Sequence, residues 1–456
     1  MLGHDNESLH DIVRLDRSLL DAAERFGTPA YVMDVAAIAS AASALESAFR
    51  PPWVLQYSLK ANDLPAITAF LHQRGWGANV VSTGEWQFAR QVGVPNRATT
   101  FEGIGKTDAQ LEHAVLEAAA GRPLRWLAVE SAAEAELLAE LSDRHQLGRG
   151  GRLPIDVLLR LNPQVSPETR AEFAVGRAAS KFGMTDAEIL TLAGGSTFGR
   201  PGLRVRGVHV HTGSDLQDVG AWTSAGVRAT RLLHKIAVLH DSADTVDFGG
   251  GFPLPADAAP SPAQFLEALM SALDEAGLPL PARPAIEPGR YLVGQAGWLV
   301  TSVLHAKPPH EGAGLAQAVL DAGMTEFIRP ALYGSHHSAH ALGPDDHRPD
   351  SISSTALEGP VCESTDSFGV HRLPPLRRGD VIAIENAGAY AASFTSRYNG
   401  RPAPAEALLW PDGALELCSR PEIARLGPAS QPSPAMARRP SAGDRPTRVT
   451  QCTAAN

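Results

Sequence analysis

The sequence has few cysteines, no long apolar run and no excess of basic residues. Three cysteines in 456 residues, Cys362, Cys418 and Cys452, are too few for a disulfide framework and indicate a reducing compartment, the cytoplasm. Residues 1–16 lack the basic and apolar segments of a secretory signal. No stretch approaches the roughly 20 apolar residues that a membrane helix needs. The sequence is therefore unlike that of a disulfide-rich secreted protein or a membrane protein.

The charge and composition are those of an acidic globular protein. A formal net charge of −10, without a basic stretch to offset it, disfavours nucleic acids and anionic membranes as partners. The hydrophobic content of 44% is ordinary for a globular chain. At 456 residues the chain is too long for one small core. We expect one large and one smaller domain.

Residues 36–290 alternate short apolar strands with helical stretches. The predicted strands are WVLQYS (53–58), ANVVS (78–82), ATTFEG (98–103), WLAVES (126–131), DVLLRLN (156–162), VRGVHVHT (205–212), TVDFGGG (245–251) and PAIEPG (284–289). Eight such units in about 250 residues predict a closed (β/α)₈, or TIM, barrel, an α/β fold. An open doubly wound sheet is the alternative, but YSLKAND lacks the glycine-rich turn that usually follows its first strand.

The pattern differs on both sides of this barrel. Residues 1–35 predict a helix and a strand, AYVMD, that joins a β domain. Residues 291–426 contain strand-like runs separated by Gly and Pro, which predict a C-terminal antiparallel β domain. Residues 427–456 hold five prolines and almost no large apolar residues, and we expect a disordered tail.

Lys60, in YSLKAN (57–62), ends the first predicted barrel strand. An ionised lysine is costly to bury, so it needs a partner, a solvent-facing position or a covalent role. A single lysine at a strand end is usually a surface residue that extends its charge into solvent. In a (β/α)₈ barrel, however, the C-terminal ends of the strands form the active site.

Three more motifs end later barrel strands: HTGS (211–214), GGG (249–251) and EPGR (287–290). Glycines allow backbone N–H groups to approach a phosphate closely. Ser214 adds a hydroxyl group, and Arg290 adds a charge-assisted hydrogen bond. These motifs therefore predict a phosphate site at the same end of the barrel as Lys60.

The remaining polar groups at this end suit pyridoxal 5′-phosphate (PLP). Lys60 would form the Schiff base, His211 offers a flat ring, and Glu287 would keep the pyridine nitrogen protonated. A positively charged ring nitrogen makes the cofactor a strong electron sink. Each motif alone has an ordinary structural explanation, and only their order at successive strand ends favours the cofactor.

The other histidines are not expected to be functional. His209 and His211 alternate along one strand, so we expect one to face the barrel interior and the other the helices, with His209 in a structural role. No acidic or cysteine partner stands at zinc spacing from the remaining candidates, His305, His310, His336, His337 and His340. We therefore expect no metal.

Five motifs in order, YSLKAN, HTGS, GGGFP, EPGR and GPVCESTD, resemble the fold-type III PLP-dependent decarboxylases, a family that includes diaminopimelate, ornithine and arginine decarboxylases. The resemblance runs from about residue 27 to 420. It implies an alanine racemase-like barrel with a C-terminal β domain, in a head-to-tail homodimer. It also implies the Schiff-base role for Lys60, ring stacking for His211 and the pyridine-nitrogen contact for Glu287.

The resemblance implies further roles residue by residue. Phosphate contacts are implied for Ser214, Gly250, Gly251, Gly289 and Arg290. Tyr390, in ENAGAYAASF, resembles a cofactor-contacting tyrosine. Cys362 and Glu363, in CES, resemble residues that reach into the partner subunit's site, where the cysteine acts as an acid toward the carbanion. Without the resemblance, Cys362 would be interpreted as a small buried thiol.

The stretch DAGMTEFIRPALYGSHH resembles the diaminopimelate branch of the family. Arg329 and Tyr333 suit a carboxylate, and Glu363 suits an amine. A substrate with a distal amino-carboxylate satisfies all three residues. The resemblance thus implies decarboxylation of meso-diaminopimelate to L-lysine.

Three positions depart from that branch. TRAEFAVG (169–176) stands where a THPxISTG-like run is usual, Asn79 replaces an aspartate, and His336 replaces an aromatic residue. A decarboxylase of another carboxylate-bearing amino acid, for instance in a siderophore or antibiotic pathway, therefore remains open.

Two other classes share the barrel. A racemase would need a second base and would place an arginine, not Glu287, at the pyridine nitrogen, so EPGR argues against it. A non-catalytic PLP carrier would be a short single barrel without a β domain. The sequence favours a PLP-dependent amino-acid decarboxylase, a carboxy-lyase.

Overall fold

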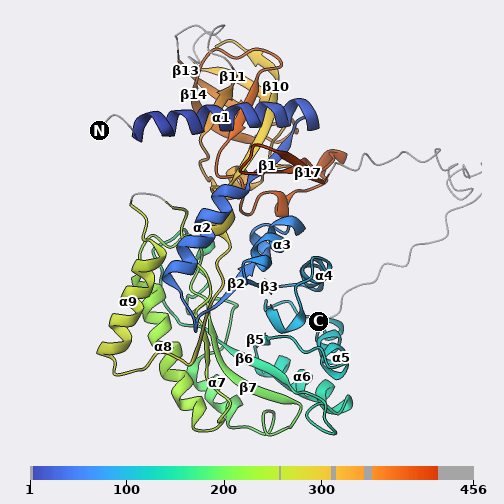
Figure 1. The fold of residues 1–456 in the computed structure, drawn as a ribbon, viewed down its shortest axis with the longest axis vertical. Coiled ribbons are helices and arrows are strands. Elements are labelled where there is room, and N and C mark those ends of the chain that lie inside the picture. Colours follow the sequence, from blue (N-terminus) through green and yellow to red (C-terminus); the bar gives the residue numbers. More distant parts are fainter. Residues whose placement is uncertain (1–3, 256–257, 310–314, 344–351, 420–456) are drawn as a thin grey trace, which may run out of the picture.

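A computed structural model describes residues 4–255, 258–309, 315–343 and 352–419. Eight parallel strands close into a barrel in chain order (Figure 1). They are β2 (Val54–Ser58), β3 (Gly77–Val80), β4 (Thr99–Phe101), β5 (Trp126–Val129), β6 (Ile155–Leu161), β7 (Leu203–Val210), β8 (Thr245–Asp247) and β9 (Arg283–Ile286). The barrel closes where β2 pairs with β9. The predicted (β/α)₈ barrel is confirmed.

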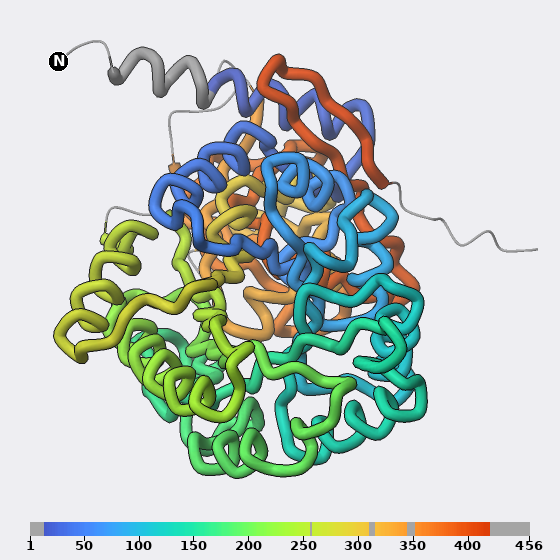
Figure 2. Tube along the Cα trace, turned by 60° about the horizontal axis from the view of Figure 1, so that its bottom comes forward, coloured from blue at the N-terminus to red at the C-terminus, as the bar shows by residue number. Residues whose placement is uncertain are grey.

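Helices surround the barrel and place their apolar faces against its strands (Figure 2). They are α2 (Val35–Ala48), α3 (Pro65–Gln73), α4 (Thr83–Gln91), α5 (Asp108–Ala119), α6 (Ala132–Arg144), α7 (Asp186–Ala193), α8 (Gly220–Ala237) and α9 (Pro262–Glu275). Several helices begin at a Ser or Thr that caps the first turn, with capping boxes at Thr107, Thr185 and Ser261. These local signals fix where each strand-to-helix loop ends.

A second domain is built on a nine-stranded sheet, which helix α1 (His4–Phe26) crosses (Figure 1). Its strands are β1 (Ala30–Asp34), β10 (Gly297–Lys307), β11 (Ala316–Leu320), β12 (Ala339–Leu342), β13 (Ser353–Glu358), β14 (Ser367–Leu373), β15 (Val381–Ile384), β16 (Ala405–Leu409) and β17 (Leu415–Ser419). The predicted β domain is present and mostly antiparallel. Two strand pairs, β1 with β16 and β11 with β13, are parallel.

The segment after β2 is hydrogen-bonded to a segment of the β domain that lies more than 300 residues later. Asn62 Nδ2 donates to the carbonyl of Gly388 at 3.0 Å. The amide of Tyr390 donates to the carbonyl of Ala61 at 2.7 Å. A Cβ atom on Gly388 would lie 1.8 Å from the carbonyl oxygen of Val293. Only glycine at position 388 therefore lets its backbone pack this closely against Val293. The two domains therefore meet at the C-terminal end of the barrel.

The largest hydrophobic cluster lies between the barrel strands and the helices. In its aromatic part Phe49, Trp222, Phe252 and Phe265 make edge-to-face contacts, and Phe248 packs on Trp222 in a tilted arrangement. No helix among the described residues is long and apolar enough to span a membrane. The expected tail, residues 427–456, and Cys452 lie outside the described part of the chain.

Candidate active site

A cavity of about 440 Å³ opens where the C-terminal ends of the barrel strands meet the β domain. Both domains line it. It brings together eight of the residues that the sequence predicts for the site: Lys60, His211, Ser214, Glu287, Arg290, Arg329, Tyr333 and Tyr390. Groups separated by more than 300 residues in the sequence therefore face one pocket.

Lys60 lies in a single 3₁₀ turn, Leu59–Ala61, directly after β2. Its side chain is half-buried and faces the cavity. Within the described residues its amine has no hydrogen-bond or ion-pair partner, whereas its carbonyl accepts a hydrogen bond from Ser393 Oγ at 3.2 Å. The β domain therefore fixes the backbone of Lys60 and leaves the amine available.

A cradle for an anion lies beside Lys60. Arg290 begins the short helix α10 (Arg290–Val293), and its Nε and Nη2 atoms each lie 3.1 Å from Ser214 Oγ. A Cβ atom on Gly250 would lie 2.5 Å from the carbonyl oxygen of Glu287, and one on Gly289 would lie 2.8 Å from Ala61 Cβ. A side chain at either glycine would clash with these neighbours, so the glycines let the loops pack closely beside Ser214 and Arg290, whose hydroxyl and guanidinium suit the phosphate of PLP.

Gly251 and His211 form another wall of the cradle. Gly251 has a φ of +112°, a conformation that L side chains rarely adopt. The amide of Gly250 donates to His211 Nδ1 at 3.3 Å, which fixes one nitrogen of the ring as an acceptor. Burial is the main cause that lowers the pKa of His211 well below its usual range, and the charge of Lys60 adds to it. His211 is therefore a neutral ring at the site.

Two arginines and three aromatic rings form the outer part of the cavity. The Arg290 guanidinium lies 5.1 Å from the Tyr390 ring centre and 5.2 Å from that of Phe173. Arg329, at the start of α11 (Arg329–Tyr333), lies 5.8 Å from the ring centres of both Phe173 and Tyr333. Burial lowers the pKa of Arg329 to about 10, which leaves it protonated at neutral pH. Phe173, which contacts both arginines, was not predicted as a site residue.

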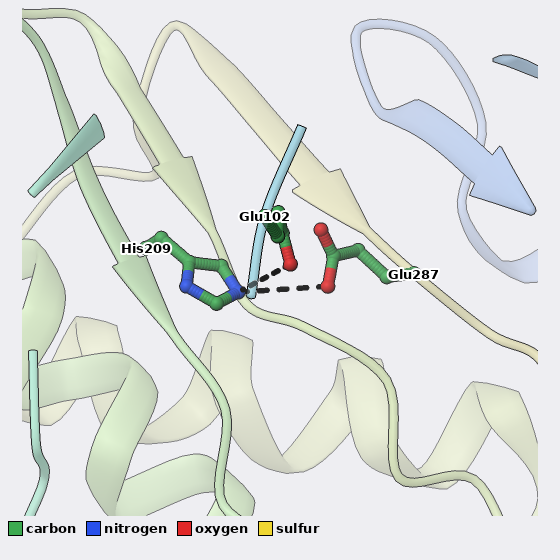
Figure 3. A group of neighbouring side chains, drawn as sticks. All are labelled: Glu102, His209 and Glu287. Carbon is green, nitrogen blue, oxygen red and sulfur yellow. Dashed lines mark ion pairs between the residues drawn. The ribbon is translucent and has the colours of Figure 1, made fainter. Parts of the chain in front are cut away.

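The floor of the cavity is a buried acid–imidazole group (Figure 3). His209 Nε2 lies 3.4 Å from Glu102 Oε2 and 3.5 Å from Glu287 Oε2. Asn79 Nδ2 donates to the other oxygen of Glu287. All four side chains are at least 95% buried. Glu287 therefore lies at the cavity with its carboxylate held from two sides.

The prediction for His209 was wrong. His209 and His211 both line the cavity, and His209 has no hydrogen-bond partner among the described residues. Side chains alternate along a strand, so residues two apart share a face and do not point in opposite directions. Because His209 lies in β7 and His211 follows the strand directly, the inward orientation of one implies that of the other.

Cys362 and Glu363 lie outside this cavity. Cys362 is exposed on the surface of the β domain. Glu363 is also exposed and accepts a hydrogen bond from the Tyr398 hydroxyl at 2.7 Å. Within one chain, Cys362 and Glu363 therefore do not join the eight predicted residues that line the cavity.

The cavity contains what PLP chemistry requires. An available lysine amine, the Ser214–Arg290 pair and a buried carboxylate at Glu287 surround one space. Residues 35–294 match the family described as pyridoxal-dependent decarboxylase, pyridoxal binding domain. The chain belongs to the pyridoxal-dependent decarboxylases. Its predicted family, cofactor and enzymatic class are therefore confirmed.

Full-length relatives of this decarboxylase support the same assignment. Diaminopimelate decarboxylase of Deinococcus radiodurans is 35% identical over 410 residues, 89% of this chain and 96% of the relative. That of Zymomonas mobilis is 32% identical over 400 residues, 86% of this chain and 90% of the relative. The similarity therefore extends through both domains.

Solved structures of related enzymes match a similar share of this decarboxylase. Diaminopimelate decarboxylase from Helicobacter pylori in complex with L-lysine has a TM-score of 0.77 and 29% identity, covering 88% of this chain and 96% of that one. The enzyme from M. jannaschii in complex with L-lysine has a TM-score of 0.78 and 28% identity, covering 88% and 91%. A barrel carrying a β domain is thus the common architecture.

Proposed function

We propose that this decarboxylase removes one carboxyl group from meso-diaminopimelate and releases L-lysine. The relatives named as diaminopimelate decarboxylases support this substrate, and so do the two L-lysine complexes. Conversion of this substrate would place the chain in lysine biosynthesis. The observation that carries the proposal for this chain is the environment of Arg329.

Arg329 is 5% exposed and faces the cavity. Among the described residues no carboxylate forms an ion pair with it, and its contacts are the faces of Phe173 and Tyr333. A buried guanidinium without a counter-ion is costly unless a ligand supplies the anion. A substrate with a second carboxylate, far from the reacting carbon, would provide that anion.

The other residues take the following roles. When bound, PLP supplies an electron sink for the electron pair left by the departing carboxyl group. Lys60 supplies the amine that attaches the cofactor, and Glu287 accepts the hydrogen bond of the ring nitrogen. His211 would contact the ring face. Ser214, Gly250, Gly251, Gly289 and Arg290 would hold the phosphate, and Tyr390 would lie beside it.

The outer groups orient the substrate. Arg329 and Tyr333 hold the distal carboxylate, which fixes the reacting end against the cofactor. Cys362 of a second copy donates a proton to the α-carbon, and Glu363 of that copy binds the distal amine. Both belong to a second copy because in this chain they lie on the surface.

A homodimer with shared active sites is therefore part of the proposal. Ile104 and Phe394 line the cavity and are 39% and 45% exposed, and Leu332 of α11 is 53% exposed. Exposed apolar side chains at the entrance of a site are favourable places for a second chain to pack. We place the enzyme in the cytoplasm, where the free thiol of Cys362 stays reduced.

The proposal is tested by measuring CO₂ release from the PLP-loaded protein on meso-diaminopimelate, L-lysine, D-lysine, ornithine, arginine and glutamate. We expect turnover of meso-diaminopimelate, with L-lysine as the product. Preference for ornithine or L-lysine would contradict the role of Arg329.

A second outcome points to a different substrate. Phe173, in the divergent segment 169–176, contacts both arginines of the cavity and its ring centre lies 5.0 Å from that of Tyr333. If the cofactor is bound but none of the six amino acids is decarboxylated, the substrate is another amino acid with a distal carboxylate. That result would contradict meso-diaminopimelate and keep the decarboxylase assignment.

A further inference from the structure

Glu102 is a buried carboxyl group at the cavity that the proposed reaction does not use. It follows β4 directly, its side chain is 3% exposed, and its backbone amide donates to the carbonyl of Val80. Its carboxyl group lines the same cavity as Lys60 and Glu287. The fold therefore places a second acid on the floor of the cofactor site.

Glu102 and Glu287 approach the same nitrogen of His209 from two sides (Figure 3). Oxygen atoms of the two carboxyl groups and the imidazole nitrogen all lie within 4.8 Å of one another. Two carboxylates this close, both buried, repel each other strongly when both are ionised. One of the two is expected to keep a proton.

His209 does not neutralise the pair. Burial is the main cause that lowers its pKa to about 4, so the imidazole is uncharged at neutral pH. The other charged or titratable groups facing this floor come from neighbouring strand ends: Lys60, Glu130, Arg160 and Asp247. Arg160 is already ion-paired with Glu130, and burial raises the pKa of Asp247. Once Lys60 holds the cofactor, none of these groups supplies an unpaired cation for a second carboxylate beside Glu287.

The hydrogen bonds distinguish the two acids. Asn79 donates an N–H to Glu287 Oε1, which favours an ionised oxygen at that position. Glu102 Oε1, in contrast, is buried without a hydrogen-bond partner among the described residues. Burial, and next the charge of Glu287, raise the pKa of Glu102 to about 8. The proton therefore belongs on Glu102.

We propose that Glu102 is a positioning residue that stays protonated and, with Asn79, holds Glu287 as the single carboxylate facing the ring nitrogen of PLP. The floor then carries one negative charge opposite one ring N–H. Glu102 acts on the cofactor through Glu287. The inference rests on the PLP site and is independent of which amino acid is decarboxylated.

The direct test is infrared difference spectroscopy of the PLP-loaded wild type and the Glu102→Gln variant. A protonated carboxylic acid has a carbonyl stretch that a carboxylate and an amide lack. We expect this band in the wild type at pH 6.5, its loss around pH 8, and its absence in Glu102→Gln. The proposal would be overturned if the band disappeared at the ordinary pKa of a glutamate side chain. It would also be overturned if the wild type and Glu102→Gln had the same band at pH 6.5.

Glu406→Gln is the matched control. Burial also raises the pKa of Glu406, but this residue lies on β16 and bonds Ser419, away from the cavity. We expect Glu406→Gln to keep the Glu102 band. Burial also raises the pKa of Asp247, so the wild-type band is assigned to Glu102 by its loss in Glu102→Gln.

PLP affinity is a second readout, which tests whether Glu102 helps to position the cofactor. Glutamine reproduces the shape and donor capacity of a protonated glutamate, so Glu102→Gln should retain PLP and its absorbance spectrum. Glu102→Ala should bind PLP about tenfold more weakly, the scale of one lost hydrogen bond to a charged group. Equal affinity for Ala and wild type would overturn the positioning role. Neither measurement depends on CO₂ release, so a wrong substrate assignment would not affect it.

Stability gives a third readout with a defined sign. The folded state keeps the proton of Glu102 to about pH 8, whereas an unfolded glutamate loses it near its ordinary pKa. Between these two pH values the wild type should lose stability relative to Glu102→Gln, and above about pH 8 the difference should level off. A difference in Tm that is constant across this range would contradict the protonated state.

Discussion

The cofactor half and the substrate half of the cavity are built differently. The cofactor half is formed almost entirely by barrel strand ends, and one chain supplies a cradle, a ring, a lysine and a carboxylate. The substrate half is formed by α11 and the β domain, while Cys362 and Glu363 lie on the outside of the same chain. One chain supplies the groups of the cofactor half, whereas in the proposed dimer a second chain completes the substrate half.

This difference separates generic chemistry from specificity. Strand ends of a closed barrel are fixed by the hydrogen bonds of both neighbouring strands, so groups placed there hold their geometry. Groups on a second domain and a second chain can change without disturbing the barrel. The variants below test this division, beginning with the largest effect.

Lys60→Ala removes the amine on which the cofactor half depends. We expect loss of the protein-bound cofactor absorbance and of detectable CO₂ release, because no other lysine lines the cavity in the described part of the chain. Absorbance titration with PLP and a CO₂ assay measure both. Lys307→Ala, an exposed lysine at the end of β10, is the control. Full activity of Lys60→Ala would refute the assignment.

Arg329→Gln affects the substrate half alone. Losing a charge-assisted contact to the distal carboxylate should lower kcat/KM roughly 10²- to 10³-fold. PLP affinity should stay near the wild-type value. Steady-state kinetics and PLP titration separate the two, with the exposed Arg372→Gln as control. If Arg329→Gln released PLP but kept KM, Arg329 would belong to the cofactor half.

Mixing two inactive variants tests whether a second chain completes the site. Cys362→Ala should bind PLP and turn over slowly, and Lys60→Ala should be inactive. After subunit exchange in equal amounts, about half of the dimers are mixed and each has one intact site, so about a quarter of wild-type activity should return. Activity no higher than the average of the separate variants would exclude a shared site.

Phe173→Ala is expected to have the smallest effect. Its ring contacts Arg290 and Arg329, so its removal should lower kcat/KM about tenfold through weaker orientation of both cations. Comparing KM with PLP affinity shows which arginine depends more on the ring. If KM and PLP affinity both stayed unchanged, the Phe173 ring would only exclude solvent from the cavity.

The sequence predicted the cofactor half well because its residues follow strands that are themselves recognisable. Eight apolar runs predicted eight strands, and the polar groups after the first, sixth and eighth of them meet at one cavity. Glu102 escaped notice because it stands in an ordinary-looking stretch, FEGIGK, without a motif of its own. Only the curvature of the closed barrel brings it opposite Glu287.

The β domain was harder to predict. The strand-like runs GWLVTSVLHAK, AQAVLDAG, DVIAIEN and AEALLW predict β10, β11, β15 and β16. Strands β12, β13, β14 and β17 were not predicted, because they are partly exposed and have weak apolar alternation. The parallel pairing of β1 with β16 joins strands from the two ends of the chain, and no local pattern encodes such a pairing. Phe173 was missed for a similar reason, since two of its partners, Arg329 and Tyr333, belong to the other domain.

The hydrogen bonds that hold the Lys60 segment also set the order of events during synthesis. Ser393 bonds the carbonyl of Lys60 across 333 residues of sequence, and Gly388 bonds Asn62 across 326. At about 5–20 residues per second, a ribosome needs roughly 15–70 s to span that interval. A nascent chain therefore carries Lys60 throughout that interval before the site is complete. Cofactor capture thus follows synthesis of the β domain.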